Sequence, residues 1–545
     1  MNRIPAWAVV CAGCLFFWTS TARPQADWTT PGYDAQRSSW IRADGKISAT
    51  SVQGPDFKLL WKMKLDNEPR QLNALTPPVL FDFYIGHRGF RSFGFIGGSS
   101  GKIFAMDTDL ARMDWEKRLG SQPPSGSLDC PGGMTANVTR PTAAAIPPLI
   151  PFVGRGRRNP AGSGVGKPNE GAVTLAVVDR PSSPRPAPPK STSSRVRAAP
   201  TRSLRGLRLV YALSSDGMLH TMYVSNGQNR VPPMKFLPPN ANAQGLIVVD
   251  NVAYVATTNG CGGVADGVWA LDLESKKVTN WKSETGAVAG VAGPAFGAEG
   301  TIYVATAGGA IVALEAKTLK QAGSYAPGGA GFTSSPVVID YNEKDYVAAT
   351  AKDGTIHLLD GTNLGGSNGQ TPVDRTPSYS TSSGFVPGAL ATWKDSDGVK
   401  WVLAPSGSAP SRGAAFPVTN GQVKDGAIVA WKVVDRNGSP SLEPGWISRD
   451  MVSPLPPIVV NDVVFSVSSG VFGAGDTSMS AEQRAGRSSP AKLYALDGAS
   501  GKVLWESSDA ISSFAPKNGL SAGAGAVYLS DYEGTLYSFG FPMEH

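Results

Sequence analysis

An internal repeat constrains the fold of this chain more than any other feature of its sequence. Each copy has an apolar strand, a glycine turn and a second apolar strand that ends in Ala-Leu-Asp or a close variant. Several copies add a further strand that carries Trp. The clear copies span 93–107, 253–272, 301–315, 346–360 and 492–505, and weaker copies span 210–220, 401–446 and 527–537. Self-similarity of this kind is typical of repeat architectures and propellers.

The spacing of the copies identifies the architecture. Asp272, Glu315 and Asp360 occupy the same repeat position and follow one another at intervals of 43 and 45 residues. This interval is the length of a four-stranded propeller blade, and longer intervals elsewhere are blades with loop insertions. The sequence therefore predicts an all-β protein, an eight-bladed β-propeller of four-stranded antiparallel blades.

The two ends of the repeat array complement each other. The last copy, at about 518–541, has no Trp strand of its own, whereas Trp61 has no preceding copy. We expect residues 57–65 to complete the eighth blade, so that the N-terminal strand closes the ring and leaves no free sheet edge.

Each repeated residue type has a mechanical role. The turn glycines allow the positive φ of tight hairpins, and the Asp that follows can accept hydrogen bonds from the next turn. The Trp residues, which are large and apolar, should cover the seams between blades. These are Trp61, Trp115, Trp281, Trp446 and Trp505.

The N-terminus has the features of an export signal. Arg3 supplies positive charge, residues 4–18 are apolar, and Ser20, Thr21 and Ala22 are small. We predict a signal peptide at 1–22 and a mature chain, 23–545, that is a single propeller domain without a transmembrane segment. The expected location is periplasmic or extracellular.

A basic segment interrupts the second blade. Twelve Arg or Lys lie between Gly154 and Arg208 against Glu170 and Asp179, whereas the whole chain has a net charge of +7. The segment has no aromatic residue and is rich in Pro and Ser, so it cannot bury enough apolar surface to order itself. We predict a disordered insertion at 151–206. No nucleic-acid partner is expected, because no aromatic residues alternate with the charges.

Two cysteines remain in the mature chain, Cys130 and Cys261. Cys130 lies in the connection that leaves the first blade, and Cys261 lies in a loop of the third blade between its second and third strands. The strand order places both on the same face of the ring. We therefore predict a disulfide between them, as an oxidising compartment would allow. The few scattered His residues, with no Cys-x-x-Cys-His and no paired Cys-x-x-Cys motifs, predict no metal site of the zinc or haem type.

The repeat resembles that of the quinoproteins, the pyrroloquinoline quinone dehydrogenases and their non-enzymatic relatives. Ala495-Leu496-Asp497, Gly501-Lys502 and Trp505 fit that family's Ala-x-Asp-x-x-x-Gly-Lys-x-x-x-Trp motif, and Asp27-Trp28 through Arg37 is similar to the start of such proteins. The resemblance implies pyrroloquinoline quinone with calcium as the cofactor, with no cofactor as the alternative. The chain lacks the adjacent Cys pair of the alcohol dehydrogenases, and no position matches the family's calcium ligands or catalytic Asp.

Loop insertions elaborate one face of the predicted ring. They lie around Cys261, between residues 407 and 425, and between residues 470 and 492. Ligands bind propellers at the mouth of the channel, and the polar residues of the blade connections on this face are candidates for binding the cofactor, with solvated loop residues as the alternative. The candidates are Asn137, Arg140, Asn259, Lys517 and Asn518.

The sequence thus favours an exported, quinone-binding-like propeller that acts as a scaffold for a protein or small-molecule ligand at the channel mouth. The alternative is a pyrroloquinoline quinone-dependent alcohol or sugar dehydrogenase. Whether the chain is an enzyme is left open at this point.

Overall fold

The computed structural model describes residues 27–86, 89–121, 126–145, 208–381, 385–517 and 519–542. All of them belong to one compact unit, formed by Met1–Ile146 with Leu204–His545. The signal peptide predicted at 1–22 and the insertion predicted at 151–206 lie outside the described residues and stay predictions.

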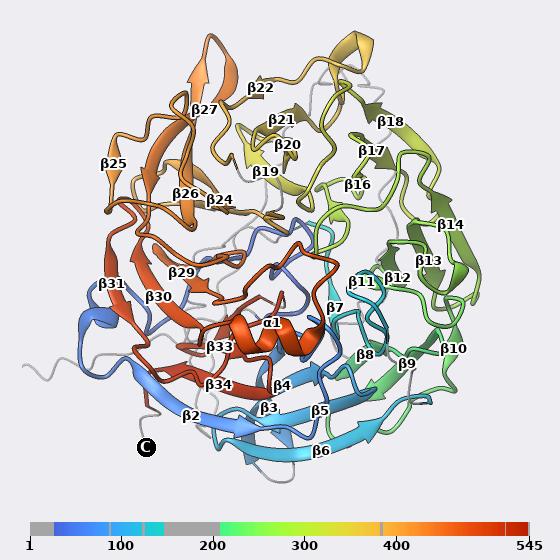
Figure 1. The fold of residues 1–545 in the computed structure, drawn as a ribbon. Coiled ribbons are helices and arrows are strands. Elements are labelled where there is room, and N and C mark those ends of the chain that lie inside the picture. Colours follow the sequence, from blue (N-terminus) through green and yellow to red (C-terminus); the bar gives the residue numbers. More distant parts are fainter. Residues whose placement is uncertain are drawn as a thin grey trace, which may run out of the picture. The chain divides into compact units, whose positions relative to one another are not determined.

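Eight sheets follow one another around a ring (Figure 1). Blade 1 comprises β3 (Val79–Gly86), β4 (Gly89–Gly97), β5 (Lys102–Asp107) and β6 (Arg112–Arg118); blade 2 comprises β8 (Leu209–Leu213), β9 (Met218–Tyr223) and β10 (Met234–Lys235); blade 3 comprises β11 (Ala243–Val249), β12 (Val252–Thr257), β13 (Gly267–Asp272) and β14 (Val278–Lys282); blade 4 comprises β15 (Ala295–Phe296), β16 (Ile302–Ala305), β17 (Ile311–Leu314) and β18 (Gln321–Tyr325).

The second half of the ring repeats this arrangement. Blade 5 comprises β19 (Val337–Tyr341), β20 (Lys344–Thr350), β21 (Ile356–Asp360) and β22 (Asp374–Arg375); blade 6 comprises β23 (Ala391–Lys394), β24 (Lys400–Ser406), β26 (Ala427–Arg436) and β27 (Ser439–Ile447); blade 7 comprises β28 (Ile458–Val460), β29 (Val463–Ser468), β30 (Lys492–Asp497) and β31 (Val503–Glu506); blade 8 comprises β32 (Ser521–Gly523), β33 (Ala526–Ser530), β34 (Thr535–Gly540) and β2 (Lys58–Lys64). The eight-bladed all-β prediction is confirmed. Among the described residues, no helix is long and apolar enough to cross a membrane.

The N-terminal strand closes the ring as predicted. Strand β2 pairs antiparallel with β34, with Lys62 opposite Tyr537 and Lys64 opposite Thr535. Figure 1 shows the two strands, blue and red, side by side. The N-terminal and C-terminal parts of the propeller therefore share one blade.

Four blades depart from the expected four antiparallel strands. The inner strand of blade 2 is reduced to a single bridge between Thr139 and Tyr211. The next residues, β7 (Pro141–Thr142), pair instead with β11 of blade 3; Pro141 has no N–H to donate to a ladder, which weakens a longer inner strand here. Blade 3 therefore gains a parallel strand, and blades 6 and 7 gain parallel strands from β25 (Val418–Thr419) and β1 (Trp40–Ile41).

Three of the five seam tryptophans, Trp61, Trp115 and Trp446, donate a hydrogen bond to the neighbouring blade. Nε1 of Trp61 donates to the carbonyl of Thr108 at 3.0 Å, and Nε1 of Trp446 donates to that of Gly498 at 2.7 Å. Gly501, the glycine of the motif, packs against the indole of Trp446, because a Cβ at Gly501 would lie 2.3 Å from that indole. The repeat Trp of one blade thus contacts the repeat Gly of the next blade.

The motif aspartates bond to the turns that follow them. Oδ1 of Asp107 accepts hydrogen bonds from the backbone N–H groups of Asp109 and Leu110. In blade 7, Oδ1 of Asp497 accepts one from the N–H of Ser500 at 2.9 Å. These bonds confirm the architectural role predicted for the acidic position.

Residues 28–44, hereafter the N-terminal segment, pass along the inner strands of the blades. Backbone carbonyls of the segment accept hydrogen bonds from six blades and a side chain of the segment accepts one from a seventh. The donors and acceptors are Leu80 N to Trp28 O, Arg140 N to Thr29 O, Phe296 N to Ala35 O, Val338 N to Gln36 O, Thr392 N to Ser38 O, Val459 N to Ser39 O, and Gly525 N to Asp44 Oδ2. The remaining blade, blade 3, is reached by Arg37, so the segment bonds to the whole ring.

Arg37 is the most deeply buried charge of the N-terminal segment, with 1% of its surface exposed. Its guanidinium donates to the carbonyls of Pro294 at 2.9 Å and Gly245 at 3.0 Å, and within the segment to Thr30 Oγ1 and the Pro31 carbonyl. Burial lowers the pKa of this group, and the bonded oxygens stabilise its charged form. Arg37 therefore joins the segment to blades 3 and 4.

Candidate functional site

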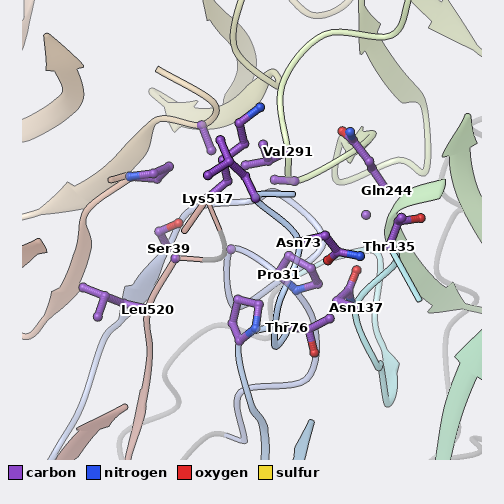
Figure 2. A pocket seen from close by; sticks show the side chains of 18 of the residues that line it. Pro31, Ser39, Asn73, Thr76, Thr135, Asn137, Gln244, Val291, Lys517 and Leu520 are labelled. Carbon is purple, nitrogen blue, oxygen red and sulfur yellow. The ribbon is translucent and has the colours of Figure 1, made fainter. Parts of the chain in front are cut away.

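A pocket of about 200 Å³ occupies one mouth of the channel (Figure 2). Its wall is built from the connections that lead into the inner strands of successive blades. Residues from seven of these connections contribute to it: Asn73, Thr76 and Pro77 for blade 1, Thr135 and Asn137 for blade 2, Asn242 and Gln244 for blade 3, Val291 and Ala292 for blade 4, Ala389 for blade 6, Pro456 and Pro457 for blade 7, and Lys517 and Gly519 for blade 8.

The N-terminal segment lines the same pocket. Trp28, Pro31, Gly32 and Ser39 all belong to the lining, and Figure 2 shows Pro31 among the wall residues. Because the backbone of the segment is bonded to the inner strands, it closes the pocket from within the channel. The inner wall of the pocket therefore comes from residues that precede the first blade.

The predicted disulfide fixes the rim of this pocket. Cys130 and Cys261 are bonded, with their Cα atoms 5.6 Å apart. The adjacent carbonyl of Asp129 accepts hydrogen bonds from the side-chain amides of Asn242 at 2.9 Å and Asn259 at 3.0 Å. Leu128, Asp129 and Pro131 line the pocket. The connection from blade 1 to blade 2 is thus held against blade 3 at the mouth.

The insertion between β29 and β30 adds to the same face, as the loop analysis predicted. It carries α1 (Ala481–Arg487), which lies in front of the ring in Figure 1. Arg484 is 1% exposed and donates hydrogen bonds to the carbonyls of Phe472, Gly473, Asp476 and Met479, so it holds the loop in shape. Val471 of the insertion packs in a cluster with Leu72 and Leu128, which also line the pocket.

The lining contains one cation and one carboxylate, Lys517 and Asp129. Lys517 is exposed to solvent in the mouth, although protein atoms surround it on most sides. Desolvation lowers the pKa of its ammonium group; the charge of Asp129 raises this pKa and that of Arg484 lowers it. The described residues place no carboxylate within ion-pair distance of Lys517. A cation in this state gains stability from an anionic ligand.

Asn137 supplies the complementary group. It is 6% exposed, and its Nδ2 donates to the carbonyls of Val138 at 2.7 Å and Leu246 at 3.1 Å. Its Oδ1 is buried without a hydrogen-bond partner. Figure 2 shows Thr135 and Asn137 on one side of the pocket and Lys517 on another. The lining of the pocket therefore contains an unused acceptor, buried in the wall, and a cation that forms no ion pair among the described residues.

The structure brings together three of the five candidate residues. Asn137, Asn259 and Lys517 line the pocket. Arg140 lies outside its lining, where it is 7% exposed, ion-paired with Asp27 and stacked 3.7 Å from the ring centroid of Phe81. Asn518 lies outside the described residues. A cofactor-binding role for any of the five stays a prediction.

Sequence reasoning missed two parts of the site. Asn73 and Thr76 lie in the connection from β2 to blade 1, which corresponds to the connections that supplied the other candidates. Extending the same comparison to blade 1 would have found them. In the N-terminal segment the sequence indicates only a family-like opening, and the repeat contains no signal for its place in the pocket.

No known family model matches the chain, and no curated protein resembles it in sequence. Solved structures do resemble it. The quinohemoprotein alcohol dehydrogenase from Comamonas testosteroni matches with a TM-score of 0.51 at 13% identity, over 95% of this chain and 81% of that chain. Quinohemoprotein alcohol dehydrogenase ADHIIG from Pseudomonas putida HK5 matches with a TM-score of 0.52 at 12% identity, over 95% and 81%. The chain has the eight-bladed propeller fold of the quinoproteins.

The quinoprotein fold agrees with the repeat motif and with the number of blades. Identity this low carries the fold and no residue roles. The chemistry of the mouth therefore rests on the residues described above, above all Lys517 and Asn137.

Proposed function

We propose that this protein is an exported, non-enzymatic propeller that binds a small molecule at the channel mouth. The ligand carries an acidic group and a hydrogen-bond donor. The observation that supports this most is the pairing, in one pocket, of the unpaired ammonium of Lys517 with the unbonded Oδ1 of Asn137. The disulfide supports export, because such bonds persist in oxidising compartments.

The energetics of the two groups favour such a ligand. A buried acceptor without a partner costs about 1 to 3 kcal/mol, which a donor on the ligand would recover. A hydrogen bond between an ammonium and a carboxylate is about twice as strong as one between neutral groups. Together they select an acid with a donor group over a neutral molecule of the same shape.

The wall of the pocket is held in place by its surroundings, which favours binding of a ligand without a change of conformation. The rim is fixed by the Cys130–Cys261 disulfide, and the inner wall is fixed by backbone hydrogen bonds to the blades. A site already in its bound shape loses little entropy when the ligand enters. Its volume of about 200 Å³ suits a small organic acid.

Pyrroloquinoline quinone with calcium fits this pocket poorly. Calcium takes about 6 to 8 oxygen ligands, usually with several carboxylates. Asp129 is the one carboxylate in the lining, and the described part of the chain contains no group of three or more His, Cys, Asp or Glu side chains that could hold a metal. The quinone itself bears several acidic groups, for which Lys517 is the one cation in the lining.

A quinone-dependent alcohol or sugar dehydrogenase is the second candidate, favoured by the fold similarity to two quinohemoprotein alcohol dehydrogenases over 95% of the chain. Reconstitution with pyrroloquinoline quinone and calcium, followed by dye-linked assays over alcohols, aldoses and aldehydes, separates the two. We expect turnover far below about 1 per second. Turnover at or above that rate would establish the dehydrogenase instead.

Replacing Lys517 with Met tests the ligand-binding proposal directly. A panel of small carboxylic acids and their neutral amides is titrated by calorimetry into the wild type and the variant. We expect at least one acid to bind, its amide to bind at least tenfold more weakly, and Lys517→Met to weaken the acid at least tenfold, which corresponds to about 1.4 kcal/mol.

The control for that experiment is Lys502→Met, which removes an exposed lysine from the outer part of blade 7. It should leave the affinity unchanged. Failure of every acid to bind, or equal affinity of the Lys517→Met protein, would contradict the proposal.

A further inference from the structure

A second group of cations lies at the other end of the channel. Strand β1 runs parallel to the inner strand of blade 7, from the mouth toward the turn at Asn461. Trp40 in β1 and Arg42, which follows β1, therefore lie toward the end of the channel opposite the mouth. Lys400 follows the turn between β23 and β24 of blade 6. Turns that join first to second strands lie opposite the connections that build the mouth pocket. The cluster of Trp40, Arg42 and Lys400 is thus separate from that pocket.

Trp40 is the centre of this cluster. Cζ of Arg42 lies 4.9 Å and Nζ of Lys400 lies 5.6 Å from the centroid of its ring. All three residues are half-buried, so they are screened from bulk water yet reachable from it. Contact with an aromatic face stabilises a cation but satisfies none of its N–H groups.

Two N–H donors of the cluster are unsatisfied. Nε1 of Trp40 and Nε of Arg42 are buried without a hydrogen-bond partner. No ion pair among the described residues includes Arg42 or Lys400. Each unmet buried donor costs about 1 to 3 kcal/mol, so two in one place indicate a missing acceptor.

The surrounding charges leave the cluster positive. Asp34 is the buried carboxylate nearby, and both of its oxygens already accept hydrogen bonds from Ser38. Burial and the charge of Arg42 lower the pKa of Lys400 to about 8, the charges of Asp340 and Asp34 raise it, and that of Lys394 lowers it. Arg42 and Lys400 are both positively charged and lie beside the same indole, so they repel each other unless an anion lies between them.

We propose that Trp40, Arg42 and Lys400 form a binding site for a phosphate-type oxyanion at the end of the channel opposite the mouth. The oxyanion accepts hydrogen bonds from the indole N–H, the guanidinium and the ammonium. Arg and Lys together with a neutral N–H donor are the groups that bind phosphate in proteins. The site is independent of the ligand proposed for the mouth.

Calorimetric titration with sodium phosphate at pH 7, against sodium chloride of equal ionic strength, tests this site. We expect binding with a dissociation constant on the order of 1 mM or below. Lys400→Met and Arg42→Met should each weaken it at least tenfold. Lys502→Met, which removes an exposed lysine from the outer part of blade 7, should change the affinity less than twofold.

A pH series with sulfate, which does not titrate in this range, checks the role of the ammonium. Affinity should fall at least fivefold between pH 7 and about pH 9.5, because Lys400 loses its proton. The fall should be absent in Lys400→Met. No phosphate binding by the wild type, equal binding by Lys400→Met, or tighter binding of acetate than of phosphate would overturn the proposal. Loss of phosphate binding in Lys517→Met would place the anion at the mouth and also overturn it.

Discussion

Replacing Arg37 with Met should lower the free energy of unfolding by about 3 to 5 kcal/mol. The change removes the donor shared by the carbonyls of Gly245 and Pro294, which stay buried without that bond. It also releases Thr30 and Pro31 within the N-terminal segment. The N-terminal segment contacts the inner strands around the ring. Loss of the Arg37 hydrogen bonds should therefore loosen the mouth pocket as well.

Urea unfolding monitored by tryptophan fluorescence measures this effect. Arg42→Met is the matched control, since Arg42 belongs to the same segment but its Nε has no hydrogen-bond partner. In chloride buffer it should cost less than about 1 kcal/mol. Equal losses in the two variants would show that Arg37 does not hold the segment in place.

Removing the disulfide with Cys130→Ser and Cys261→Ser together should cost about 2 to 5 kcal/mol. The bond closes a loop whose ends are 131 residues apart, and the entropy of so long a loop gives a value near the upper end. The rim of the pocket should loosen too, because Asn242 and Asn259 are bonded to the carbonyl of Asp129 beside the disulfide.

The oxidised wild type and the wild type reduced with dithiothreitol are compared with the double variant by calorimetric melting. Reduction should reproduce the loss seen in the variant, and the affinity for the mouth ligand should fall in parallel. A change in stability below about 1 kcal/mol on both routes would show that the bond fixes nothing that the propeller does not already hold.

Much of the fold follows from the sequence because its signals are local. A blade is about 45 residues of alternating strands and turns, and each turn carries its own glycine and aspartate. Pairing of Cys130 with Cys261 followed from the face on which each connection must lie. Blade 2 departed from the pattern where Pro141 interrupts hydrogen bonding, and β7 joined blade 3 instead.

The site was only partly predictable. Asn137, Asn259 and Lys517 were found because blade connections of one kind meet at one end of the channel. Arg140 comes from the same connection as Asn137 but pairs with Asp27, and nothing in the spacing of the two residues distinguishes them. Which side chains of a connection face the pocket depends on packing against residues far away in the sequence.

The sequence by itself determined the number of blades, the closure of the ring and the face that carries the insertions, since periodic strands and turn residues encode them repeatedly. Only the tertiary structure decided the path of the N-terminal segment. That segment has no regular period, and its order comes from single hydrogen bonds to blades up to several hundred residues away, such as the bond from Val459 N to Ser39 O. The pocket at the mouth and the cations around Trp40 exist because that path brings them together.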